Sequence, residues 1–128
     1  MRSALWAGAV GLMVVACGSS TSPYGGSGGT PTCTSTATQA CMINTSFSPT
    51  NLTVSVGTTV TWKNSDGFAH TVNSATGSPG TAYSSGNVAA GGTFQHTFSA
   101  AGTYPYYCMI HGLDGMPPTG MHGTITVQ

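Results

Sequence analysis

Charge is what this chain of 128 residues lacks most, because only 3% of its residues are charged and the formal net charge is zero. Arg2 and Lys63 are the only strong cations, and Asp66 and Asp114 are the only acids. A nucleic-acid-binding protein needs a basic face, since phosphate contacts supply much of its affinity. We therefore expect no nucleic-acid partner.

The sequence also lacks sustained helical periodicity, and its longest apolar run, residues 4–16, is too short to span a bilayer as a stable helix. Short alternating runs rich in Val and Thr are separated instead by Gly and Ser, as in Leu52, Val54 and Val56. Roughly seven such runs after residue 38 predict an all-β fold, a two-sheet β-sandwich. Its later strands are expected at Phe68–Asn73, Thr93–Ser99, Thr103–Cys108 and Gly123–Gln128.

The N-terminal part is typical of an exported lipoprotein. Residues 1–16 combine Arg2 with an apolar run, as a signal peptide does. Val-Val-Ala-Cys at residues 14–17 resembles the bacterial lipobox, in which the cysteine, here Cys17, is lipidated. Residues 17–37 are a Ser/Gly/Thr/Pro-rich tether, and residues 38–128 are the folded domain. We expect a domain exported to the cell envelope and lipid-anchored to a membrane, with an ordinary signal peptide as the alternative.

Cysteines are few, and the four in the chain divide by context. Cys17 is the lipidation candidate, and Cys108 lies among histidines and methionines. Cys33 and Cys41 remain, and outside the cytoplasm they would form a disulfide that closes a short loop. Two free thiols or an additional metal site are the alternatives.

The stretch YYCMIHGLDGMPPTGMHGTITV, residues 106–127, is rich in soft metal ligands. It contains Cys108, His111, Met116, Met121 and His122. Thiolate and imidazole select copper or zinc, whereas a thioether is a poor zinc ligand. Two histidines, one cysteine and a weak axial methionine form the trigonal blue-copper set. The pattern therefore predicts one copper ion.

A second histidine ligand has to be chosen from three others. His70 follows the turn cluster Asn-Ser-Asp-Gly and begins a predicted strand, where a loop would present it. His96 lies in the middle of a strand, between Phe94 and Phe98, and His122 falls on the polar face of the last strand. His70 is therefore the predicted ligand.

Three segments carry a resemblance to a known family. NSDGFAHTV, GTFQHTFSAAGTYPYYCMIH and GMHGTITV resemble the plastocyanin/amicyanin group of cupredoxins, over Phe47 to Gln128. The resemblance implies a Greek-key sandwich of eight strands with type 1 copper at one end, bound by His70, Cys108, His111 and a methionine. It also implies that the Thr71 N–H donates to the cysteine sulfur.

The methionine is where this chain departs from the family pattern. Met116 has the expected count of four residues after His111, whereas Met121 has the expected context, directly before x-Gly and the last strand. The residues MPPTG look like an insertion between these two positions. Loops tolerate insertions better than strand junctions do. Met121 is therefore the predicted axial ligand, and Met116 the alternative.

By the same resemblance, the function is one-electron transfer between Cu(I) and Cu(II) by a monomeric protein that is not an enzyme. His111 would be the electron port, and redox partner proteins would dock on the apolar patch around it, formed by Gly112, Leu113, Met116, Pro117 and Pro118. The main alternative is a copper carrier or storage protein of the cell envelope. A fragment of a copper oxidase or nitrite reductase and a metal-free sandwich are weaker ones.

Overall fold

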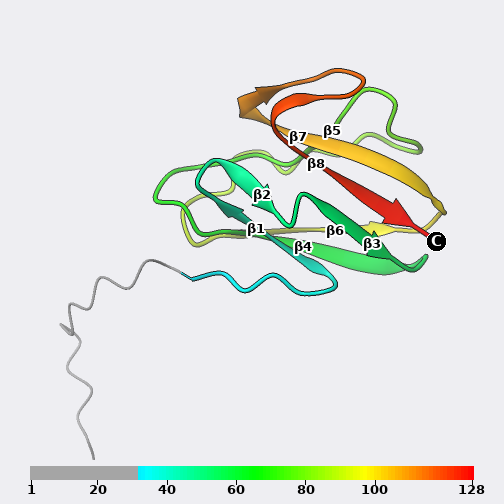
Figure 1. The fold of residues 1–128 in the computed structure, drawn as a ribbon, viewed down its shortest axis with the longest axis horizontal. Helices are drawn as coiled ribbons and strands as arrows, with labels where there is room; N and C mark the ends of the chain where they lie inside the picture. Colours follow the sequence, from blue (N-terminus) through cyan, green and yellow to red (C-terminus); the bar gives the residue numbers. More distant parts are fainter. Residues whose placement is uncertain (1–31) are drawn as a thin grey trace, which may run out of the picture.

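The computed structural model describes residues 32–128, so the predicted signal peptide, Cys17 and most of the tether lie outside the described residues. The described part of the chain contains eight strands joined by turns and loops, and none of it is helical (Figure 1). The strands are β1 (Gln39–Ile43), β2 (Ser46–Ser48), β3 (Asn51–Val54), β4 (Thr58–Asn64), β5 (Asn73–Ser74), β6 (Thr93–Phe98), β7 (Gly102–Leu113) and β8 (Thr119–Val127). Over residues 32–128, accordingly, no helix is long and apolar enough to cross a membrane.

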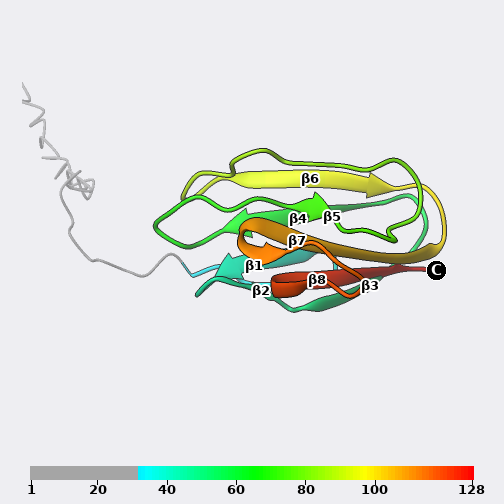
Figure 2. The ribbon, with the colours of Figure 1, turned by 90° about the horizontal axis from the view of Figure 1, so that it is seen from above.

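The strands form two four-stranded sheets, ordered β2-β1-β4-β6 and β3-β8-β7-β5. The pairs β1–β4 and β3–β8 are parallel, and the other pairs are antiparallel. The edge strands β6 and β3 lie on opposite sides of the molecule in Figure 2. This arrangement confirms the predicted two-sheet sandwich.

Aromatic side chains fill the space between the sheets. Trp62 from β4 and Tyr106 from β7 are fully buried, and their ring centroids lie 5.3 Å apart. Tyr106 also determines the residue opposite it, because a Cβ atom on Gly123 of β8 would lie 2.5 Å from the Tyr106 hydroxyl oxygen. The inward face Tyr104, Tyr106 and Cys108 is buried, as the alternation predicts. The core therefore leads along β7 directly to the cysteine.

Two predicted details of the strands are wrong. Residues 68–73 form no regular strand, because His70 makes only an isolated bridge with Val88 and β5 is reduced to Asn73–Ser74. Val56 does not continue the buried face, because β3 ends at Val54 and Val56 lies in the following turn, half exposed. In both places the chain leaves the sheet. Successive side chains there no longer point to opposite faces of a sheet, so the apolar–polar pattern does not indicate which residues are buried.

The last two strands extend further than the sequence indicates. β7 continues through Cys108 and His111 to Leu113, and β8 begins at Thr119 rather than at Gly123. The closed end of the hairpin that they form lies away from the C terminus (Figure 1). Gly120 enables its closure, with φ of 73° and the His111 carbonyl oxygen 2.7 Å from where a Cβ would be.

The N-terminal edge of the domain is held by a disulfide. Cys33 and Cys41 are bonded, with their Cα atoms 5.8 Å apart. Cys41 lies in β1, which pairs with β2 on one side and with β4 on the other. The residues that lead into the domain are therefore attached to an interior strand of one sheet.

Candidate metal centre

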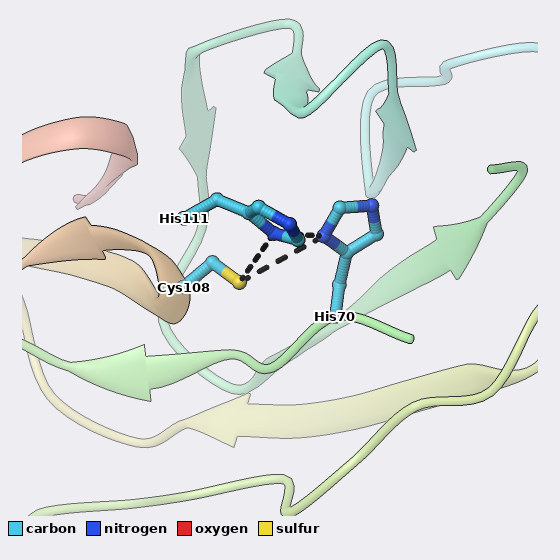
Figure 3. A group of neighbouring side chains, drawn as sticks. All are labelled: His70, Cys108 and His111. Carbon is cyan, nitrogen blue, oxygen red and sulfur yellow. Dashed lines mark hydrogen bonds between the residues drawn. The ribbon is translucent and has the colours of Figure 1, made fainter. Parts of the chain in front are cut away.

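Three predicted ligands converge at the end of the sandwich that carries the β7–β8 hairpin. The Cys108 Sγ lies 3.8 Å from the His70 Nδ1 and 3.7 Å from the His111 Nδ1, and the two Nδ1 atoms are 3.1 Å apart. Figure 3 shows the sulfur and both rings pointing toward one another. Two of the side chains, His70 and Cys108, are fully buried, and His111 is half-buried. The structure thus brings together residues 38 positions apart in the chain.

The donor atoms have the spacing that one metal ion requires. With metal–nitrogen and metal–sulfur bonds of about 2.0 and 2.3 Å, a trigonal plane places sulfur about 3.7 Å from each nitrogen and the nitrogens about 3.5 Å apart. The two sulfur–nitrogen distances match, and the nitrogen–nitrogen distance of 3.1 Å is slightly shorter. A thiolate with two imidazoles is a soft donor set. The three residues therefore fit a single copper ion.

His70 is held through both its backbone and its ring. Its N–H donates to the Val88 carbonyl at 3.1 Å, and its carbonyl accepts from the Val88 N–H at 2.8 Å. Asn64, a buried amide, donates to the carbonyls of Val88 and Phe68 and so braces the loop that carries the histidine. On the ring, Nε2 lies 2.8 Å from a carboxylate oxygen of Asp66. The ligand is thus fixed on the side away from the donor atoms.

Asp66 belongs to the turn cluster before His70, and its contact with the ligand was not predicted from the sequence. Burial opposes its ionisation, but hydrogen bonds from Thr45, His70 and Asn44 outweigh that effect and hold the pKa of Asp66 below its ordinary value. The only signal in the sequence is an acid four residues before the ligand histidine. That signal carries little information alone, because Asp is common in turns.

Cys108 receives the hydrogen bond that the family resemblance implies. The Thr71 N–H donates to Sγ at 3.3 Å, and the Thr71 hydroxyl oxygen accepts from the Met109 N–H at 2.9 Å. Thr71 therefore contacts the cysteine sulfur and the next residue along β7. A donor that faces a thiolate stabilises its negative charge and helps to set its properties as a ligand.

A bulge in β7 places the cysteine and the second histidine. Tyr107 pairs with His122, and the next paired residue, Gly112, lies opposite Gly120. Residues 108–111 of β7 therefore lie opposite the single residue Met121 of β8. Bulges of this kind redirect side chains at the ends of sheets and beside functional sites. Here the bulge lets Cys108 and His111 turn toward the same point.

The two methionines have very different surroundings. Met121 is 3% exposed and belongs to the hydrophobic core. Met116 is 72% exposed, and its methyl carbon would lie 2.2 Å from a Cβ added to Gly77, so it packs over that glycine. Met121 is the third residue of β8, rather than a residue at the threshold of the last strand as its context indicated.

The remaining histidines lie outside this cluster. His96 stacks on Tyr83 with ring centroids 4.2 Å apart, and partial burial lowers the pKa of His96. His122 is half-buried, and its Nδ1 lies 2.8 Å from the Gly120 carbonyl oxygen. Neither residue is among the three ligands that converge.

The hairpin beyond the ligands is attached to the body of the domain by Asp114. Its carboxylate accepts hydrogen bonds from the Thr76 N–H at 2.7 Å and the Thr76 hydroxyl at 2.8 Å. Together with a hydrogen bond from Gly115, these contacts hold the pKa of Asp114 below its ordinary value. Each of the two acids in the chain therefore secures a loop at the metal end.

Comparisons with known proteins agree with this geometry. Residues 32–128 match the family of copper binding proteins described as the plastocyanin/azurin family. The chain is 36% identical over 89 residues to a plastocyanin from Scenedesmus fuscus. This match covers 64% of this chain and 86% of the relative.

Solved structures of two kinds are similar to the fold. A proline-to-alanine variant of amicyanin in its oxidised state is 30% identical, with a TM-score of 0.60, and the match covers 70% of this chain and 80% of that one. A copper-containing nitrite reductase from Thermus scotoductus SA-01 is 27% identical, with a TM-score of 0.62, but only 23% of its chain is covered against 75% of this one. Because the family match spans all of the described residues and includes the three converging ligands, this chain belongs to the plastocyanin/azurin family of copper-binding proteins.

Proposed function

We propose that the protein carries single electrons between partner proteins, using one type 1 copper ion bound by His70, Cys108, His111 and Met121. When bound there, copper supplies a Cu(I)/Cu(II) couple. The observation that carries the proposal is the convergence of one buried thiol and two imidazoles at a spacing that fits one ion. The relatives named above, a plastocyanin and an amicyanin, support the same function.

The rigidity of the ligands favours electron transfer over catalysis. Cys108 and His70 are fully buried, and they are hydrogen-bonded to the Thr71 N–H and the Asp66 carboxylate respectively. Ligands held in this way change position little between oxidation states. The nitrite reductase is matched over less than a quarter of its chain, so it supports a shared domain rather than a shared enzyme activity.

Met121 is the axial ligand in this proposal. It is buried and lies across from the four bulged residues that include Cys108 and His111. Met116 lies in the connection between β7 and β8 and is exposed. A thioether in the buried position adds a weak, soft fourth donor and excludes water from the site.

His111 is the proposed electron port. Its half-buried ring borders a shallow hollow of about 430 Å³, lined also by Ile110, Gly112, Leu113, Thr119 and Gly120. Ile110 and Leu113 in this lining are large, exposed apolar side chains, and Phe68, Met109 and Met116 are three more on the loops and strands that carry the ligands. Phe68 packs against both ligand rings, with centroids 5.0 Å from His70 and 5.5 Å from His111. Among the large apolar residues described, only Val56 is similarly exposed elsewhere.

This surface is the proposed docking site for redox partner proteins. It differs from the predicted patch because Pro118 is buried, whereas Phe68, Met109 and Ile110 are exposed and were not predicted to belong to it. Exposed apolar patches of this kind mark interaction sites. The chain has only two acids and two strong cations, so charge would contribute little to docking. We propose further that the protein acts as a monomer, exported to the cell envelope and anchored to a membrane through Cys17.

One experiment tests the function against its alternative, a copper carrier. The protein loaded with Cu(II) should show the intense visible absorption of a copper–thiolate bond, which ascorbate should bleach. Mixing the reduced protein with ferric cytochrome c should then reduce the haem and restore the colour, while all copper stays with this protein after separation. The rate should change by less than about threefold between low and physiological salt.

Two results would contradict the proposal. The first is the absence of the visible band in the folded, copper-loaded protein. The second is that the colour does not return upon mixing and that copper is lost to an apo acceptor protein. This result would identify a copper carrier. A matched Cys108→Ser variant provides the control, because it removes the thiolate and leaves both histidines in place.

A further inference from the structure

The carboxylate of Asp66 connects the buried copper ligand to a part of the chain distant in sequence. Its Oδ1 accepts from the Asn44 N–H at 2.8 Å, and its Oδ2 accepts from the Thr45 N–H at 3.0 Å. The same Oδ2 lies 2.8 Å from the His70 Nε2. Only 9% of the Asp66 side chain is exposed. One carboxylate thus joins the β1–β2 turn to a copper ligand.

This contact determines which nitrogen of His70 carries the proton. An ionised carboxylate accepts hydrogen bonds and donates none, so the His70 Nε2 must be the donor. In a neutral imidazole the other nitrogen then holds the lone pair. That nitrogen is Nδ1, which faces the Cys108 sulfur and the second imidazole. The ligand is therefore in its metal-binding tautomer before any metal arrives.

The turn that supplies the other two donors has an unusual backbone. Asn44 and Thr45 have φ of 51° and 53°, in the left-handed region. Two such residues suit a short hairpin turn, but a β-branched residue such as Thr45 adopts this region at an energetic cost. Both N–H groups point at Asp66, and their hydrogen bonds offset that cost. Strain of this kind, held in place by its surroundings, is characteristic of functional sites.

We propose that Asp66 is a positioning residue of the copper site, which fixes the tautomer of His70 and attaches that ligand to the β1–β2 turn. This inference rests on the copper site proposed above. The negative charge behind the imidazole also makes it a stronger donor and favours Cu(II) over Cu(I). A residue that only stabilised the turn would have none of these effects on the histidine.

The test compares Asp66→Ala and Asp66→Asn with Asp114→Asn, which removes the chain's other acid and so changes the net charge equally. Nitrogen NMR of the metal-free proteins, with Cys108 kept as a free thiol, measures the tautomer of His70 directly. The wild type and Asp114→Asn should hold the proton on Nε2, whereas Asp66→Ala should give a mixture of both tautomers. The affinity for Cu(II) should fall about 10- to 100-fold in the Asp66 variants and change little in Asp114→Asn.

The outcomes separate this inference from the function that it rests on. If the tautomer and the Cu(II) affinity of Asp66→Ala match those of Asp114→Asn while only its melting temperature falls, Asp66 merely braces the turn and the inference is overturned. If the wild type binds no copper, the proposed function fails, yet the tautomer measurement still decides the role of Asp66. If Asp66→Ala does not fold, the same measurements are made with Thr45→Gly added, because glycine relieves the turn.

Discussion

The two sides of the metal centre differ in how the protein holds them. His70 is supplied by a loop that is buried, bonded to Val88 through its backbone and to Asp66 through its ring. His111 is supplied by a hairpin that reaches beyond the sandwich and exposes large apolar side chains, of which Leu113 is 70% exposed. Cys108 lies between them, buried at the start of the bulge.

The difference indicates a division of labour. The buried side defines the ligand geometry, because every polar atom of His70 has a partner that holds it in place. The exposed side connects the site with other molecules, because the His111 ring borders open surface. A site that must keep its geometry and also exchange electrons needs both a buried, fixed side and an exposed side. The predictions below test this comparison, beginning with the largest expected effect.

The strongest test removes each histidine and supplies imidazole from solution. His70→Gly and His111→Gly should both lose the visible copper–thiolate band. Added imidazole should restore it in His111→Gly, since that ring lies beside an open hollow. Because the space left by His70 is fully buried, His70→Gly should regain less than about a tenth of the band at the same imidazole concentration. Absorption titrations measure both.

Equal recovery in the two variants would contradict the distinction between a buried and an exposed side. His96→Gly is the matched control, because His96 is also a partly buried histidine on a strand but lies outside the ligand cluster. It should keep the full band with no imidazole added.

A smaller effect is expected from the two methionines, which lie on opposite sides of the same comparison. Met121→Gln introduces a harder oxygen donor in the buried position and should favour Cu(II). The equilibrium between the oxidised and reduced forms should shift at least about tenfold, which corresponds to a reduction potential lower by about 59 mV. Met116→Gln should leave the potential unchanged, and redox titration would measure both variants.

The reverse result would assign Met116 as the axial ligand. A shift in both variants would indicate instead that the hairpin as a whole sets the potential. In that case the loop that contains Met116 would no longer count as a separate, exposed element of the site.

The smallest effect is expected at the attachment of the hairpin. Hydrogen bonds from the Thr76 N–H and hydroxyl lower the pKa of Asp114. A carboxyl whose pKa is lower in the folded state adds stability above its unfolded pKa and loses it as the pH falls through its folded pKa. Asp114→Asn should therefore melt no more than about 4 °C below the wild type at neutral pH. The difference between the two proteins should begin to shrink below the ordinary Asp pKa of about 3.9 and should vanish once the pH is below the lower pKa of the folded protein.

Thermal melting at several pH values, monitored by circular dichroism, would check this prediction. The copper spectrum of Asp114→Asn should equal that of the wild type. Thr76→Ala serves as its partner variant, because it removes the hydroxyl donor and keeps the backbone donor. A changed spectrum would mean that the hairpin attachment reaches the ligands after all.

Much of the fold follows from alternation in the sequence. Alternation of apolar residues accounts for the buried faces Val60–Trp62 and Tyr104–Tyr106–Cys108, because both lie in regular strands where side chains alternate between faces. The errors occur where backbone bonding stops being regular, at Val56 and over residues 68–73. A pattern of residue types cannot indicate where a chain leaves its sheet when the residues beyond that point are still apolar.

At the site, the ligands and the hydrogen bond from Thr71 to the cysteine sulfur could be predicted, but the other contacts that support the ligands could not. The residue types alone, one cysteine and two histidines, indicate a site for a soft metal ion, and the structure brings all three together. The contacts of Asp66 with residues 44 and 45 depend on the packing of a turn more than 20 positions away in the chain. The β7 bulge likewise depends on pairing across the hairpin, which residue types do not specify.

The disulfide gives the N-terminal end of the domain a mechanical property. Any pull on the chain before Cys33 is transmitted by the covalent bond to Cys41, without passing through residues 34–40. Cys41 lies in a strand paired on both sides, so the load is spread over hydrogen bonds with β2 and β4. If force were applied through the N-terminal segment, β1 would bear it within the sheet. The force would act there before it reached the β1–β2 turn, which Asp66 links to the copper ligand.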